Sequence, residues 1–128
     1  MILNEPSIWV GAVFGAFALK HFLADFILQP TWIVQGKEAD TRWALPLAVH
    51  CGIHAGLALV IILLVAPRLW WLALVDFGLH AVIDRAKSLF GHALRLQVDN
   101  PRFWWLLGFD QFLHQATNIL LALVVLMA

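Results

Sequence analysis

Residues 44–65 read ALPLAVHCGIHAGLALVIILLV, a run without a single charged side chain. A helix needs about 17–25 mostly apolar residues to cross a bilayer, and this run has that length. Pro46 falls in its first turn, where proline is tolerated. The run therefore predicts a transmembrane helix over residues 44–65 that carries two histidines, His50 and His54.

The rest of the chain divides in the same way on either side of this run. Pro30 ends an apolar stretch before it, and Gly91 is a plausible C-terminal cap for the stretch after it. Polar loops are expected at residues 31–43 and 91–102. We predict an all-α fold and a single transmembrane domain, residues 1–128: an up-and-down four-helix bundle with two short polar loops and helices at about 8–29, 44–65, 69–90 and 103–127.

The composition supports a membrane protein and excludes several other classes. The chain is 62% hydrophobic and 12% charged, whereas soluble domains are about 45–50% apolar and about 25% charged. The formal net charge is zero without a basic strip, so no nucleic-acid partner is expected. Cys51 is the only cysteine, which rules out an internal disulfide and leaves no basis for a thiolate metal site.

The basic residues indicate an orientation. Lys and Arg gather in and around the first and third connections, whereas Arg68 alone marks the second. By the positive-inside rule, the loops at 31–43 and 91–102 lie in the cytoplasm and both termini face outward.

Each predicted helix contains two histidine or aspartate side chains one helical turn apart. Side chains at i and i+4 lie on one face of a helix, so each pair can present two donors to one point. The four pairs are His21 with Asp25, His50 with His54, His80 with Asp84, and Asp110 with His114.

All four pairs also lie at one depth, roughly 8–18 Å below the predicted cytoplasmic ends, at about 1.5 Å per residue. A charged aspartate at the centre of a membrane helix costs about 2.5–3.5 kcal/mol, so three of them require compensation. Lys20, Arg85 and Lys87 can pair with carboxylates, but salt bridges do not explain five histidines. A divalent cation explains both residue types.

Five imidazoles and three carboxylates exceed the needs of one tetrahedral ion. We therefore expect two ions about 3.5–4 Å apart, zinc first, with iron or manganese as alternatives. Two divalent ions against three aspartates leave one positive charge, which a bridging hydroxide, the nucleophile of metal hydrolases, would neutralise.

Further polar groups flank the predicted metal ligands. Asp76 lies one turn before His80 and is expected to accept a hydrogen bond from that imidazole. Lys87 and Gln111 are the other candidate catalytic residues, and Gln29 follows Asp25 by one turn.

The strings HFLADFILQP, HCGIH, HAVIDRAK and FDQFLHQ, in this order, resemble the small bacterial membrane proteins grouped as domain of unknown function 3307. The resemblance runs from about residue 17 to residue 117 and implies a bacterial inner-membrane, multi-pass protein. The matching positions are His21, Asp25, Gln29, His50, His54, His80, Asp84, Lys87, Asp110, Gln111 and His114. More loosely, the chain resembles the YdjM-type membrane metal-dependent hydrolases.

These observations favour a metal-dependent hydrolase acting on a lipid or lipid-linked ester or phosphoester in the cytoplasmic half of the bilayer. A di-iron oxidase, a metal-ion or proton transporter, bis-histidine haem binding and a structural metal-binding subunit stay open, as does a homo-oligomer. The apolar outward segments at 55–65 and 119–128 argue against a transport path through the bundle.

Overall fold

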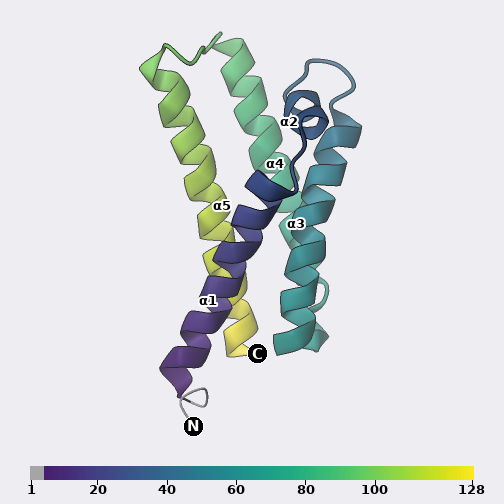
Figure 1. The fold of residues 1–128 in the computed structure, drawn as a ribbon, viewed down its shortest axis with the longest axis vertical. Coiled ribbons are helices and arrows are strands. Elements are labelled where there is room, and N and C mark those ends of the chain that lie inside the picture. The colour runs from purple at the N-terminus through teal and green to yellow at the C-terminus, as the bar shows by residue number, and fades with distance from the viewer. Residues whose placement is uncertain (1–4) are drawn as a thin grey trace.

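The computed structural model describes residues 5–128, which form a bundle of long helices with one short helix lying against it (Figure 1). The start of the first long helix, at residue 6, and the end of the last, at residue 127, lie at the same end of the bundle (Figure 1). The elements in chain order are α1 (Pro6–Phe22), η2 (Leu23–Ile27), α2 (Thr31–Lys37), α3 (Ala44–Val65), η3 (Pro67–Leu69), α4 (Leu72–Ala93) and α5 (Pro101–Met127).

The first predicted helix is interrupted. Pro6 stands at the start of α1, and the α-helix gives way after Phe22 to the π-helical turn η2. The backbone N–H of Leu28 closes this turn by donating to the carbonyl of Leu23 at 2.7 Å. The predicted helix at about 8–29 is present as one helical span, Pro6–Ile27, but it ends two residues earlier than predicted and its last turn, which carries Asp25, is π-helical. Such π-turns inside helices occur often at functional sites.

The segment predicted as the first polar loop contains the helix α2. Its first turn follows Pro30, whose carbonyl accepts hydrogen bonds from the next turn. Ile33 and Lys37, one helical turn apart, are both buried. Gly36 lies so close to Pro46 of α3 that a Cβ there would overlap the proline ring. This contact is invisible in local sequence, so the loop prediction for residues 31–37 is wrong.

The helix α3 has the predicted bounds, and the later helices are shifted. Residues 69–71 belong to η3 and the turn after it, so α4 begins at Leu72 rather than residue 69. The predicted cap at Gly91 is wrong: α4 ends at Ala93, and the left-handed residue that follows the cap is Arg95, whose φ is 50°. Leu96 then donates to the carbonyl of Gly91 at 3.0 Å, the long-range bond of a Schellman ending.

The start of α5 is defined by local chemistry. Its first residue is Pro101, and the side chain of Asn100 accepts a hydrogen bond from the backbone N–H of Arg102 at 3.0 Å. Asparagine at this position and proline just after it are typical of a helix start. The helix therefore begins two residues before the predicted residue 103.

Three helical segments are long and apolar enough to cross a membrane: Pro6–Ile27, Ala44–Val65 and Pro101–Met127. These three spans indicate a membrane protein. The helix α4 is not among them. It has 22 residues but carries Asp76, Asp84, Arg85 and Lys87. The prediction of four apolar spans is therefore wrong for this helix, which packs against α3 and α5.

The bundle has an apolar half and a polar half. Near the chain ends, buried side chains of α1, α3, α4 and α5 form one apolar cluster, among them Phe17, Ile62, Leu72 and Leu121. Large apolar side chains on the outside remain exposed, as Leu64 is at 79%, which suits a helix surrounded by lipid. The buried histidines and aspartates lie beyond the apolar cluster, toward α2.

Candidate metal centre

The structure brings all eight predicted donors into one cluster. Seven of them are at most 4% exposed, and the carboxylate of Asp25 is 10% exposed. They come from η2, α3, α4 and α5 and from the last turns of α1, which agrees with the predicted common depth. They are His21, Asp25, His50, His54, His80, Asp84, Asp110 and His114.

The imidazole of His80 lies at the centre of this cluster. Its ring stacks on His54 with centroids 3.7 Å apart and on His114 with centroids 3.9 Å apart. The ring of His50 stands 4.8 Å from that of His54, and the ring of His21 stands 5.8 Å from that of His114. Because a charged imidazolium would repel its neighbours at these distances, neutral rings suit the stack. Neutral imidazole is the form that binds metals.

Two aspartates face the ring nitrogens. The Oδ1 of Asp25 is 2.8 Å from Nε2 of His54 and 3.4 Å from Nε2 of His50. The carboxylate of Asp84 is 2.9 Å from Nε2 of His114 and 3.3 Å from Nε2 of His50. The imidazole of His50 therefore lies between both carboxylates.

Two overlapping groups of donors have the spacing of metal ligands. Asp25, His50, His54 and His80 form one group, and His80, Asp84 and His114 form the other, with the donor atoms in each group within 4.8 Å of one another. His80 belongs to both groups. The cluster could therefore hold a metal ion.

The other two predicted ligands flank these groups. His21 Nε2 lies 3.1 Å from Asp25 Oδ2, and 2.9 Å from the side-chain oxygen of Gln111. Asp110 Oδ1 lies 3.4 Å from His114 Nε2 and has no hydrogen-bond partner among residues 5–128.

Lys37, which the sequence analysis placed in a loop, belongs to the cluster. Its ammonium lies 3.0 Å from Asp84 Oδ2 and 3.2 Å from His50 Nε2. A signal was available: Ile33 and Lys37 are spaced one helical turn apart after Pro30, as on the buried face of a helix.

The predicted supporting residues have different surroundings. Asp76 binds Lys20 at 2.6 Å, and its carboxylate is 4.0 Å from His80 Nδ1, too far for the expected hydrogen bond. Lys20 also donates to Asn118 at 3.2 Å, a contact that the sequence did not reveal. Lys20 therefore pairs with Asp76 rather than with an aspartate of the four predicted pairs.

Gln111 is closer to the cluster than Lys87 is. The side-chain amide of Gln111 lies 3.2 Å from Asp110 and 3.4 Å from Asp25. Lys87 pairs with Glu38 at 2.5 Å, at the end of α2. Gln29 donates to the backbone carbonyl of Asp25 at 2.6 Å and so supports the π-turn.

A cavity of about 250 Å³ opens onto the cluster from the side of α2. Its lining includes Asp25, Lys37, Asp84, Asp110 and Gln111. A group that enters this cavity can therefore reach both carboxylates that face the histidines.

The fold and the cluster define a helical membrane protein with a buried histidine–aspartate centre that could bind metal. The chain belongs to the family described as "Protein of unknown function (DUF3307)", whose sequence model matches residues 13–128. This match confirms the resemblance to domain of unknown function 3307. The chain matches no curated protein and no solved structure, so the looser resemblance to YdjM-type hydrolases has no support from them.

Proposed function

We propose that the protein is a membrane-embedded, metal-dependent hydrolase that acts on a lipid-linked phosphoester. The observation that carries the metal site is the spacing between ring nitrogens and carboxylate oxygens. Ligands about 2.0–2.1 Å from a tetrahedral zinc ion lie about 3.3 Å from one another. The distances from Asp25 and Asp84 to the histidine nitrogens are 2.8–3.4 Å.

The donors divide naturally between two ions. One ion would take the group Asp25, His50, His54 and His80. A second would take Asp84 and His114, with the unpartnered oxygen of Asp110 as a third ligand in place of the shared His80. Zinc suits this mixture of imidazole and carboxylate, and iron or manganese are the other candidates.

Charge favours an anionic substrate. The Lys20–Asp76 pair is neutral by itself, so the centre has three carboxylates and the ammonium of Lys37, a net charge of −2. A single divalent ion would balance this charge, whereas two ions leave +2. A hydroxide and a phosphodiester carry one negative charge each and together restore neutrality. Two ions and an anionic phosphoester therefore fit together.

The roles of the neighbouring residues follow from their contacts. Metal ions held by the two donor groups would supply a hydroxide nucleophile and polarise the phosphoester, whose hydrolysis consumes one water and releases an alcohol and a phosphate. Gln111, which contacts His21 and Asp25, would orient the bound phosphate. Lys87 would hold the headgroup at the rim of the cavity. Asp76 is engaged by Lys20 and takes no part in the proposed reaction.

The apolar cluster weighs against a transporter. A transported ion needs polar groups on both sides of its binding site. Among residues 5–128, the buried polar side chains on the side of the apolar cluster end at Lys20, Asp76 and Asn118, and Phe17 and Leu121 of that cluster follow. We also propose that the cavity faces the cytoplasm of a bacterial inner membrane, with both termini outward and membrane lipid as the partner.

Elemental analysis of the purified protein tests this proposal. His54→Ala and Asp84→Ala remove one ligand from each group, and His92→Ala is the matched control, because His92 lies on the same helix as Asp84 but pairs with the exposed Asp40. We expect loss of metal in the first two variants and none in the control. Metal content unchanged in both ligand variants would overturn the metal site. Metal-loaded protein unable to cleave a fluorogenic phosphodiester lipid would overturn the hydrolase.

A further inference from the structure

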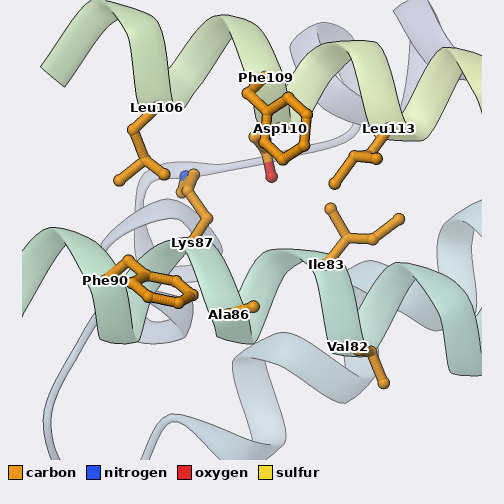
Figure 2. A pocket seen from close by; sticks show the side chains of 9 residues that line it. All are labelled: Val82, Ile83, Ala86, Lys87, Phe90, Leu106, Phe109, Asp110 and Leu113. Atoms are coloured by element: carbon orange, nitrogen blue, oxygen red, sulfur yellow. The ribbon is translucent and has the colours of Figure 1, made fainter. Parts of the chain in front are cut away.

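An apolar groove runs between α4 and α5 and reaches the candidate metal centre. Its volume is about 180 Å³. Figure 2 shows Ile83 of α4 facing Leu113 of α5 across it, and Leu106 of α5 pointing toward α4; Val82, Ala86, Phe90 and Phe109 complete the apolar lining. Lys87 and Asp110, the two charged residues in its lining, point into the space between the helices (Figure 2).

The two charged residues connect the groove to the site. Lys87 and Asp110 also line the 250 Å³ cavity that contains Asp25, Lys37 and Asp84. A molecule with an apolar chain in the groove would therefore have its polar end at Lys87, beside the metal centre. Binding sites of this kind combine apolar walls with a few well-placed polar groups.

A second groove of similar size provides an internal comparison. It lies between α1 and α3, has a volume of about 160 Å³ and is lined by apolar side chains such as Trp9, Ala16 and Leu64. No charged residue lines it within the described residues 5–128, and it shares no lining residue with the cavity at the metal centre. Ordinary membrane lipid would fill both grooves equally, whereas a bound substrate would favour the first.

We propose that the α4–α5 groove binds the hydrocarbon chain of an anionic phospholipid, entering from the bilayer, with its phosphate held by Lys87. The groove faces lipid, since Val82 is 68% exposed and Phe109 is 59% exposed. The phosphate replaces Glu38 as the partner of Lys87, and these two side chains are 32% and 20% exposed. This inference rests on the proposed function, for which it names the substrate class and the route of approach.

Photo-crosslinking tests the groove. The protein is placed in phosphatidylcholine vesicles that contain a small fraction of phosphatidic acid with a diazirine on its acyl chain, and labelled peptides are mapped by mass spectrometry. Ala86→Phe fills the α4–α5 groove, and Ala16→Phe fills the other groove as a control. Since excluding two methylenes of a bound chain weakens binding about tenfold, we expect a decrease of about that size in α4–α5 labelling for Ala86→Phe and no decrease for Ala16→Phe.

The headgroup supplies a comparison that requires no variant. A diazirine diacylglycerol has the same chains without phosphate, and we expect it to label the α4–α5 groove no more than the α1–α3 groove. Equal labelling of both grooves by phosphatidic acid, or labelling undiminished by Ala86→Phe, would overturn the proposal. Metal content is measured on the same samples. If the protein holds no metal but the α4–α5 groove is still labelled selectively, lipid binding in the groove is supported and only the proposed hydrolase is overturned.

Discussion

Replacing Lys37 with methionine should have opposite effects on the metal-free and the metal-bound protein. Without metal, the ammonium is the cationic partner of Asp84, 3.0 Å away. Asp84 retains His114 at 2.9 Å and His50 at 3.3 Å, so we expect Lys37→Met to lower the free energy of unfolding by about 1.5–3 kcal/mol, the contribution of one hydrogen bond to a charged group. With metal, the same ammonium repels the ion, and its removal should strengthen binding.

The size of the second effect follows from the distances around Lys37. A metal about 2.1 Å from Asp84 lies within about 5 Å of the ammonium, given the 3.0 Å ion pair. At an effective dielectric constant of about 20, a unit charge and a divalent ion about 5 Å apart repel by about 7 kcal/mol. Because the lysine side chain can withdraw and water can screen the pair, we expect affinity to rise about tenfold to a thousandfold, or about 1.4–4 kcal/mol.

Zinc titration and thermal unfolding in detergent measure both effects on the same protein. Lys37→Arg keeps the charge and serves as the control. Lys87→Met removes a charge that is paired with Glu38 instead, and should change zinc affinity much less. Zinc affinity unchanged or weakened in Lys37→Met would refute the placement of an ion at Asp84.

Three further outcomes are expected. Asp76→Asn should destabilise the protein by about 3–5 kcal/mol, because it leaves the buried ammonium of Lys20 without a counter-charge; adding Lys20→Met should restore most of the loss, and equal melting of the single and double variants would contradict the pairing. Gly36→Ala should displace α2 from Pro46 and lower the melting temperature, whereas Gly15→Ala, with open space around its Cβ, should stabilise α1 by about 0.5–1 kcal/mol. Stripping bound metal with a chelator should lower the melting temperature of the wild type, and an unchanged temperature would mean that the ion does not bind the folded state preferentially.

The sequence correctly predicted those parts of the structure that a local pattern of residues along the chain determines. The bounds of α3 are correct because an uncharged apolar run determines a membrane helix without reference to its neighbours. The convergence of the eight donors was predictable because i and i+4 spacing fixes a helix face and equal depth fixes a layer. Both arguments need only the rise and period of a helix.

The parts that sequence missed depend on contacts between distant segments. The close approach of Gly36 to Pro46 positions α2, and no local pattern reports it. The burial of Lys37 follows from that approach, so its charge was counted as a loop charge rather than as part of the centre. The distance of 4.0 Å between Asp76 and His80 has a similar cause, because Lys20 on another helix engages the carboxylate.

The two buried lysines differ in a way that separates stability from function. The Lys20–Asp76 pair is covered by Asn118 and bordered by the apolar cluster, so neither charge can exchange its partner without unfolding the bundle. Lys37 and Asp84 line the cavity on the side of α2, where an ion or an anion can replace either partner. A buried pair that faces a cavity can be rearranged by a ligand, whereas an enclosed pair serves only the fold. Binding at the candidate metal centre should therefore respond to changes in α2, a helix that the sequence did not reveal.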